Sequence, residues 1–343
     1  MGKRLGILTG GGDCPGLNPA IRGCVYRAAG HGYECVGLLE GWKGLIEGMT
    51  LPLAIHDVEG LVGKGGTVIG TSRTNPYKKE GGVDKCLATF KREGLSAIVA
   101  MGGEDTLGVA AKLFAEHGLP VVGVPKTMDN DLSATDYTFG FDTAATIAVE
   151  AAERLKDTGK SHRRIMVLEV MGRHAGWVAA YTGIASGADW TLLPERPVNV
   201  PAMMAHLKDI WKQRQTALVI TSEAIEIPGA PAGKEGLDEF GHMLLKKRGV
   251  GEQIAELIEK ETRIETRVAV IGHIQRGGPP TLFDRILATR VGVYAADLVA
   301  SGQFGQMVAL KGNTVVPVPL AEATAKLKTV TPEWLALLDQ LQK

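Results

Sequence analysis

The feature that most constrains the fold is a repeated alternation of short apolar runs with segments of helical pattern. The strand-like runs span residues 4–10, 33–39, 96–103, 120–125, 164–170, 216–224 and 267–274, and helical patterns follow at 107–117, 142–158, 202–214 and 282–300. The runs are continuously apolar, which is typical of strands buried on both faces of a parallel sheet. The pattern therefore predicts an α/β protein with mostly parallel sheets covered by helices.

Chain length and charge further restrict the architectures and binding partners to expect. A chain of 343 residues is long for one core, so we expect two Rossmann-like lobes. Lysine plus arginine equals aspartate plus glutamate, at 38 each, so no overall field attracts nucleic acid or an anionic membrane. Any anion site must come from a local cluster.

Membrane and export signals are not evident. No stretch approaches the roughly 20 apolar residues of a membrane span, and glycines interrupt the first apolar run. The four cysteines (14, 24, 35 and 86) lack CxxC spacing and read as reduced thiols, so no structural zinc site is expected. We expect a cytoplasmic protein, with residues 226–236 as a surface loop.

Nearly every predicted strand ends in glycines and a charged residue, at the edge where open α/β sheets bind ligands.

The motif "TGGGDCPGLN" (9–18) follows the first strand. The backbone at Gly12 can approach a phosphate, although a tight turn explains the glycines equally well. In "GGTVIGTSRTNPY" (65–77), Arg73 offers a fixed charge to phosphate, or is simply solvated.

Two carboxylates follow the third of these strands. Glu104 and Asp105 in "MGGEDTLG" (101–108) stand where side chains commonly cap a helix. Two adjacent carboxylates exceed what capping needs, and one of them can hold Mg²⁺ while substrate phosphates complete its coordination.

The next strand ends in "PKTMDND" (125–131), which brings Lys126, Thr127, Asp129 and Asp131 together. Asn and Asp after a strand are usually turn formers. A base, a cation and a hydroxyl beside a metal carboxylate nevertheless indicate phosphoryl transfer.

Charged residues also flank two later strands. Arg164 stands at one end of the first of these strands and Arg173 at the other, and Arg267 stands before the second strand with His273 and Arg276 after it. Six residues span roughly 20 Å along a strand, so one small anion cannot bridge the two ends. Arg164 and Arg267 therefore serve either the surface or a neighbouring subunit. For Glu223, a salt bridge and a bond to a substrate hydroxyl both remain open.

At these residues the chain resembles the phosphofructokinase family. The resemblance covers most of the chain in order, through "GILTGGGDCPGLN", "GTSRTNPY", "MGGEDTLG", "PKTMDNDL", "EVMGRHAGW", "GHIQRGGPP" and "DRILATRVG". It implies an active site in a cleft between two lobes, with crossings of the chain between them. We expect a donor lobe of residues 1–139 plus about 255–304, and a sugar phosphate lobe of 140–254 plus about 305–343.

The resemblance also implies roles. Asp129 would take the proton of the sugar's 1-hydroxyl, with Thr127 and Asp131 beside it, and Glu104 would hold Mg²⁺. Gly12 would contact the donor phosphates. Fructose 6-phosphate would be bound by Met171, Gly172, Arg173, Glu223, His273 and Arg276, and by Arg164 and Arg267 of a neighbouring subunit. A homodimer or homotetramer is therefore implied.

Two residues bear on the phosphoryl donor. ATP-dependent members of the family typically carry glycine in place of both Asp105 and Lys126. A carboxylate near a donor phosphate repels it by about 4 kcal/mol at 4 Å and an effective dielectric of 20, whereas a lysine attracts a shorter donor. The pair is typical of pyrophosphate-dependent members, and "GGEDT" with "PKT" resembles the mixed-substrate subgroup.

The sequence therefore predicts reversible, Mg²⁺-dependent transfer from pyrophosphate to fructose 6-phosphate. ATP as donor and sedoheptulose 7-phosphate as acceptor are the nearest alternatives. A dinucleotide-dependent oxidoreductase lacks its GxGxxG motif here, and a non-catalytic sugar phosphate sensor would not need the Glu104 and Asp129 pair.

Overall fold

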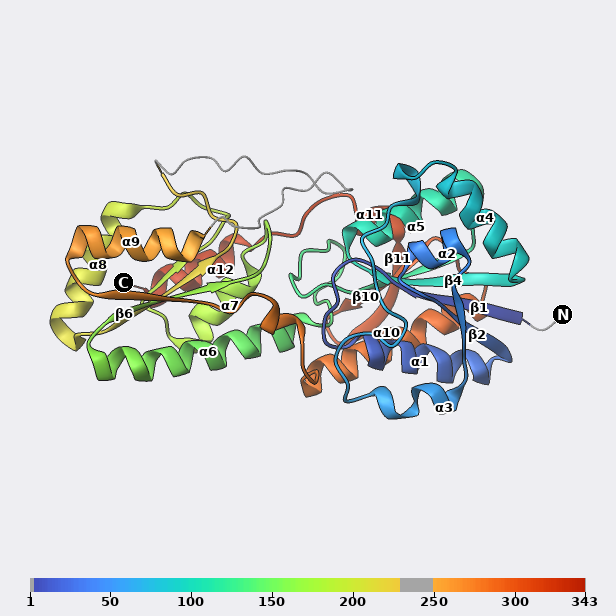
Figure 1. Ribbon diagram of the computed structural model, residues 1–343, viewed down its shortest axis with the longest axis horizontal. Coiled ribbons are helices and arrows are strands. Elements are labelled where there is room, and N and C mark those ends of the chain that lie inside the picture. The colour runs from blue at the N-terminus through green and yellow to red at the C-terminus, as the bar shows by residue number, and fades with distance from the viewer. Residues whose placement is uncertain (1–2, 229–248, 343) are drawn as a thin grey trace.

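The computed structural model describes residues 3–228 and 249–342. Two α/β lobes lie side by side, with β1 (Lys3–Thr9) in one lobe and α12 (Pro332–Leu341) in the other (Figure 1). This confirms the predicted fold class.

The first lobe is built on a seven-stranded sheet in the order β11-β10-β5-β4-β1-β2-β3. Its strands are β1 (Lys3–Thr9), β2 (Tyr33–Leu38), β3 (Thr50–Leu53), β4 (Leu95–Gly102), β5 (Val121–Pro125), β10 (Gln306–Lys311) and β11 (Thr314–Pro319). The five inner strands are parallel, and β3 and β11 pair antiparallel at the two edges.

Helices cover both faces of this sheet. They are α1 (Leu17–Gly30), α2 (Trp42–Glu47), α3 (Ile55–Val58), α4 (Gly82–Arg92), α5 (Glu104–His117), α10 (Leu282–Ala300) and α11 (Leu320–Ala323), with 3₁₀ turns η1 (Glu59–Leu61) and η2 (Pro76–Lys78). On β4, Val99 belongs to the core beneath α1 and α10, whereas Ile98 and Ala100 belong to the core beneath α5. Burial of alternate residues on opposite faces explains the continuous apolar runs.

The second lobe has a four-stranded parallel sheet in the order β7-β8-β6-β9. Its strands are β6 (Ile165–Val170), β7 (Trp190–Leu192), β8 (Ala217–Ser222) and β9 (Thr266–Val270). Around it lie α6 (Phe141–His162), α7 (Trp177–Ser186), α8 (Val200–Arg214), α9 (Val250–Thr262), α12 (Pro332–Leu341) and the 3₁₀ segment η3 (Gly272–Arg276). Two hydrophobic clusters fill its two faces.

The chain crosses between lobes before α6, between η3 and α10, and between α11 and α12 (Figure 1). The predicted boundaries are wrong in two segments. Residues 255–276 lie in the second lobe, because β9 pairs with β6 and η3 follows it, and residues 305–323 lie in the first, because β10 pairs with β5. Pairing between distant strands, which a local apolar pattern does not encode, decides both assignments.

The seven predicted strands correspond to β1, β2, β4, β5, β6, β8 and β9, although the last ends at Val270 and gives way to η3. Most of the predicted loop at 226–236 lies outside the described residues. All four cysteines are buried free thiols. Within the described ranges, no helix is both long and apolar enough to cross a membrane.

Candidate active site

One pocket opens where the carboxyl ends of β1, β4 and β5 meet two arginines from the second lobe. Its lining residues are Gly11, Gly12, Gly103, Glu104, Asp105, Thr106, Lys126, Thr127, Met128, Asp129, Asp131, Arg173 and Arg276. Motifs that are separated by up to 265 positions in the sequence thus converge on one site, at the sheet edge where α/β proteins bind ligands.

The glycine loop after β1 is held tightly on both sides. The Gly10 amide donates to the Met101 carbonyl over 3.0 Å, and the Gly11 amide donates to the Ser72 carbonyl over 2.9 Å. A Cβ atom on Gly12 would lie 2.4 Å from Nη1 of Arg276. A side chain at this position would have to displace the Arg276 guanidinium, so glycine leaves room for the arginine beside this backbone.

Lys126 brings a buried cation against this loop. Its amide donates to the Gly102 carbonyl over 2.9 Å, and its Nζ donates to the Gly12 carbonyl. The side chain is 3% exposed. Burial lowers the pKa of Lys126, and the nearby arginine charges act in the same direction. A bound anion would relieve this cost.

Asp129 and Asp131 lie in the buried turn that follows. The Asp129 amide donates to Oγ1 of Thr127 over 3.1 Å, and the intervening Asn130 adopts φ 52°. One oxygen of each carboxylate, Oδ1, is buried and has no hydrogen-bond partner among the residues that the structure describes. Burial, together with the Asp129 charge, raises the pKa of Asp131 to about 7. Such carboxylates are suited to bind a cation or a substrate proton.

Glu104 and Asp105 occupy the first turn of α5, directly after β4. Glu104 is exposed and Asp105 is half-buried. The positive end of the helix dipole favours carboxylates at these positions. Gly103 occupies the N-cap itself, and no side-chain capping bond is present there, so capping alone does not account for the pair.

The second lobe contributes a loop fixed by Glu223. The amides of Gly172 and Arg173 both donate to its Oε1, over 3.3 and 3.2 Å. Burial, together with the Asp129 charge, raises the pKa of Glu223. Arg276, 9% exposed, donates from Nη1 to the Asp13 carbonyl over 3.0 Å and so joins the lobes.

Other predicted site residues lie elsewhere. Arg73 and His273 are exposed outside the pocket lining, and Met171 is partly buried against the first lobe's core. Arg164 and Arg267 lie at the opposite, amino ends of β6 and β9, where both contact Glu265, the former over 2.9 Å.

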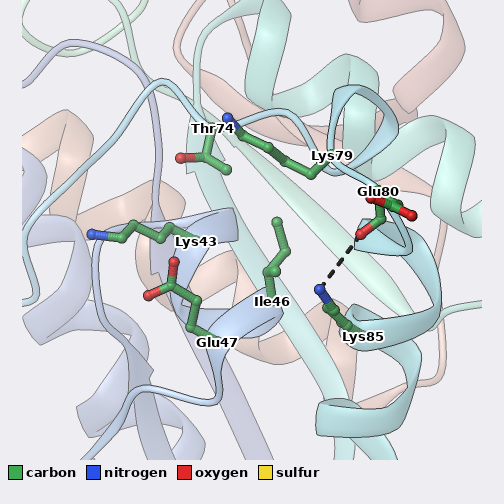
Figure 2. Close-up of a pocket in the computed structure, with 7 residues that line it drawn as sticks. All are labelled: Lys43, Ile46, Glu47, Thr74, Lys79, Glu80 and Lys85. Atoms are coloured by element: carbon green, nitrogen blue, oxygen red, sulfur yellow. Dashed lines mark hydrogen bonds between the residues drawn. The ribbon is translucent and has the colours of Figure 1, made fainter.

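A wider hollow of about 630 Å³ opens on the first lobe and is lined by Lys43, Ile46, Glu47, Thr74, Lys79, Glu80 and Lys85. Figure 2 shows Lys43 and Glu47 side by side on α2, and Lys85 donating to the Glu80 carbonyl over 3.5 Å. It contains none of the predicted catalytic residues.

Sequence reasoning missed two supporting residues. Gln275 is fully buried; its Oε1 accepts from the Met171 amide over 2.9 Å, and its Nε2 donates to the Ala144 carbonyl over 3.2 Å. Asn130 accepts from the Thr138 amide over 3.2 Å. Gln275 is adjacent in sequence to Arg276, and Asn130 is adjacent to Asp129 and Asp131. This adjacency was the only feature of the sequence that pointed to a role for either residue.

Comparisons with known proteins agree with this geometry. Residues 4–299 match the family model described as phosphofructokinase. The chain is 53% identical, over 96% of its length and 97% of the relative's, to pyrophosphate--fructose 6-phosphate 1-phosphotransferase of Amycolatopsis methanolica. It is 47% identical, over 95% of its length and 96% of the relative's, to ATP-dependent 6-phosphofructokinase of Mycobacterium bovis. A crystal structure of pyrophosphate-dependent phosphofructokinase from Marinobacter aquaeolei shares the fold with a TM-score of 0.84 at 21% identity, covering 99% of this chain and 91% of that one. The chain belongs to the phosphofructokinase family.

Proposed function

We propose that this protein transfers a phosphoryl group reversibly from pyrophosphate to the 1-hydroxyl of fructose 6-phosphate, giving fructose 1,6-bisphosphate and phosphate. The observation that carries the donor assignment is the placement of Asp105 and Lys126 in one pocket with Gly12. The name of the 53% identical relative supports the same donor.

The electrostatics of this pair favour a short donor. Lys126 reaches the glycine loop, where donor phosphates would meet backbone amides. Asp105 adds negative charge at the start of α5, where a nucleotide's inner phosphate would be repelled. Attraction of one donor combined with repulsion of another is an effective basis for specificity.

The pocket also fits Mg²⁺. The unpartnered Oδ1 atoms of Asp129 and Asp131 are hard oxygen ligands, and Glu104 lies on the same pocket. No cluster of three or more acidic, histidine or cysteine side chains suited to hold a metal ion occurs in the described part of the chain. Mg²⁺ commonly binds one or two carboxylates and completes its shell with substrate phosphates and water. Bound there through Glu104, it would offset charge on the transferred phosphoryl group.

The protein's own residues then have distinct tasks. Asp129 accepts the proton of the attacking hydroxyl, and Thr127 and Asp131 hold that carboxylate and the sugar in place. Lys126, Arg173 and the amides around Gly12 stabilise negative charge as the phosphoryl group moves in line. Met171, Gly172, Glu223, His273 and Arg276 form the sugar phosphate side, and Arg73 assists at the donor side.

Arg164 and Arg267 serve the 6-phosphate of a neighbouring subunit in this proposal. Their position at the far end of β6 and β9 puts them beyond reach of their own pocket. β9 is an edge strand, and apolar side chains from β9 to α10 are notably exposed: Val270 47%, Ile274 68%, Leu282 74%, Phe283 41% and Ile286 51%. An unpaired edge with exposed apolar groups favours association with a second copy.

A matrix of initial rates tests the proposal, with pyrophosphate and ATP as donors and fructose 6-phosphate and sedoheptulose 7-phosphate as acceptors, at fixed Mg²⁺. We expect turnover with pyrophosphate and fructose 6-phosphate. Turnover with ATP alone would overturn the donor, and turnover with sedoheptulose 7-phosphate alone would overturn the acceptor.

The double change Asp105→Gly and Lys126→Gly isolates the donor pair. We expect pyrophosphate-dependent kcat/KM to fall by 10²-fold or more, the order for loss of a charged contact made in the transition state, and ATP use to rise. Unchanged ATP use would mean that nucleotide exclusion lies outside these two residues.

A further inference from the structure

A segment between α11 and α12, residues 324–331, crosses from the first lobe to the second (Figure 1). We refer to it as the interlobe strap. It lies beside residues 126–131, which follow β5 and which we call the catalytic turn because they carry the proposed base. The Lys328 amide donates to the Asp131 carbonyl over 2.8 Å, and Leu327 forms an antiparallel bridge with Leu132. The strap is thus hydrogen-bonded to the backbone that carries the proposed base.

The Lys328 side chain turns back onto the same loop. Its Nζ donates to Oδ1 of Asn130 over 3.2 Å, to the Thr135 carbonyl over 3.0 Å and to the Asp136 carbonyl over 2.6 Å. Three acceptors match the three donors of an ammonium group. One cation therefore closes the loop from residue 130 to residue 136.

The second lobe holds this lysine from the other side. Nζ lies 5.4 Å from the ring centroid of Trp177 on α7, and the Trp177 indole donates to the Lys328 carbonyl over 3.0 Å. Two residues on, the Val330 amide donates to Oε1 of Glu195 over 2.9 Å, and the same oxygen accepts from the Gly176 amide over 2.8 Å. The strap therefore bonds directly to Trp177 at the start of α7, and it is linked through Glu195 to Gly176, at the end of the loop that begins at Arg173.

Asn130 is the link to chemistry. It separates the two aspartates, adopts φ 52°, and its Oδ1 accepts from both the Thr138 amide and Lys328. Asparagine tolerates the left-handed conformation because its short polar side chain can hydrogen-bond locally, so these bonds favour the backbone that carries the two aspartates. Loss of Lys328 would remove one of the two donors that fix Asn130.

We propose that Lys328 is a positioning residue, which acts through Asn130 to hold the Asp129 and Asp131 carboxylates and to set the first lobe's catalytic turn against the second lobe's Arg173 loop. The inference rests on the phosphoryl transfer proposed above. Burial lowers the pKa of Lys328 to about 8, as expected for a cation withdrawn from water into this junction.

Steady-state kinetics of Lys328→Met, Lys328→Arg and the matched control Lys326→Met test the proposal. Lys326 is an exposed residue of the same strap. We expect Lys328→Met to lower kcat by 10-fold to 100-fold with KM for both substrates within threefold, since the binding groups remain while the reacting geometry loosens. Lys328→Arg keeps the charge and should recover part of kcat, and Lys326→Met should match the wild type.

A double-mutant cycle with Asn130→Gly distinguishes positioning from general support. Glycine removes the side-chain acceptor and tolerates the positive φ. If Lys328 acts through Asn130, the double variant should lose little more kcat than the more impaired single variant; independent effects that multiply would overturn the link.

Two results would overturn the inference: a normal kcat in Lys328→Met, or an equal loss in Lys326→Met. If Lys328→Met fails to fold, Lys328→Arg and Asn130→Gly carry the test through the same kcat and KM comparison. An inactive wild type would instead refute the proposed function, so the two failures are distinguishable.

Discussion

The two ends of the second sheet carry the same residue type in opposite circumstances. At the carboxyl ends of β6 and β9, Arg173 and Arg276 enter a pocket with buried carboxylates, of which Asp131 has a raised pKa. At the amino ends, Arg164 and Arg267 meet the partly exposed Glu265, whose pKa is lowered chiefly by its hydrogen bond with Arg164.

This difference distinguishes a binding site from a surface ion pair. Buried ionisable groups are unstable in their charged forms unless a neighbour compensates them, and a bound ligand of opposite charge can supply that compensation. The arginines at the amino ends share a partly exposed carboxylate, and ion pairs near water contribute little to stability. This contrast agrees with the proposal that the pocket end carries out the reaction and that Arg164 and Arg267 serve a phosphate of a neighbouring subunit.

The largest effect should come from the base at the pocket end. Asp129→Asn keeps the shape and removes the proton acceptor, so we expect kcat to fall by about 10³-fold with KM nearly unchanged. Asp209→Asn, on the surface of α8, is the matched control. A loss below tenfold would mean that another group takes the proton.

The second prediction compares the two arginine positions directly. Arg276→Met removes a pocket cation and the contact with the Asp13 carbonyl, so kcat should fall by about 10²-fold. Arg267→Met should leave kcat within a few-fold and raise KM for fructose 6-phosphate by about tenfold or more, as for one lost charged hydrogen bond. Equal kinetic profiles would erase the distinction between the two ends.

Mixed subunits make that distinction sharper. If Arg267 serves a neighbour, a hybrid of Asp129→Asn and Arg267→Met subunits contains one site with both wild-type residues. Reassembly of the two variants at subsaturating sugar phosphate should therefore yield more activity than either variant alone. Activity that only averages the two parents would place Arg267 outside the neighbouring site.

The convergence of Gly12, Glu104 and Asp129 could be predicted from the sequence for a physical reason. The carboxyl ends of parallel strands meet at one edge of the sheet, so residues that follow these strands lie close together whatever the structure of the loops. Exposed residues such as Arg73 and His273 have no such constraint. Their side-chain placement depends on loop packing, and the structure leaves both outside the pocket lining.

Long-range pairing accounts for what the sequence did not reveal. Strand β10 joins the first sheet by pairing with β5, and Lys328 reaches Asn130 across 198 positions. Neither relation leaves a periodic or compositional signal. The hairpin of β10 and β11 could have been recognised from its "KGN" turn, but its sheet could not.

The smallest predicted effect concerns stability rather than rate. Asp284 at the start of α10 accepts from Oγ1 and from the amide of Thr143 on α6, over 2.6 and 2.8 Å, and so joins the lobes. Burial raises its pKa to about 6 from an ordinary 3.8. The folded state then binds this proton more tightly than the unfolded state, so wild-type stability falls as pH rises from about 4 to 6 and levels off above that.

Asp284→Asn cannot titrate, so its melting temperature relative to the wild type should rise between pH 4.5 and 7.5. The shift corresponds to about 2 kcal/mol, or roughly 3 °C for a chain of this size. Glu265→Gln is the matched test at the amino ends of β6 and β9, and we expect its stability difference from the wild type to change with pH in the opposite direction. Because the folded-state pKa of Glu265 is lowered, the wild type gains stability relative to this variant as pH rises through the ordinary carboxyl range. The same direction of shift in both variants, measured by calorimetry, would contradict the opposite pKa shifts of these two carboxylates.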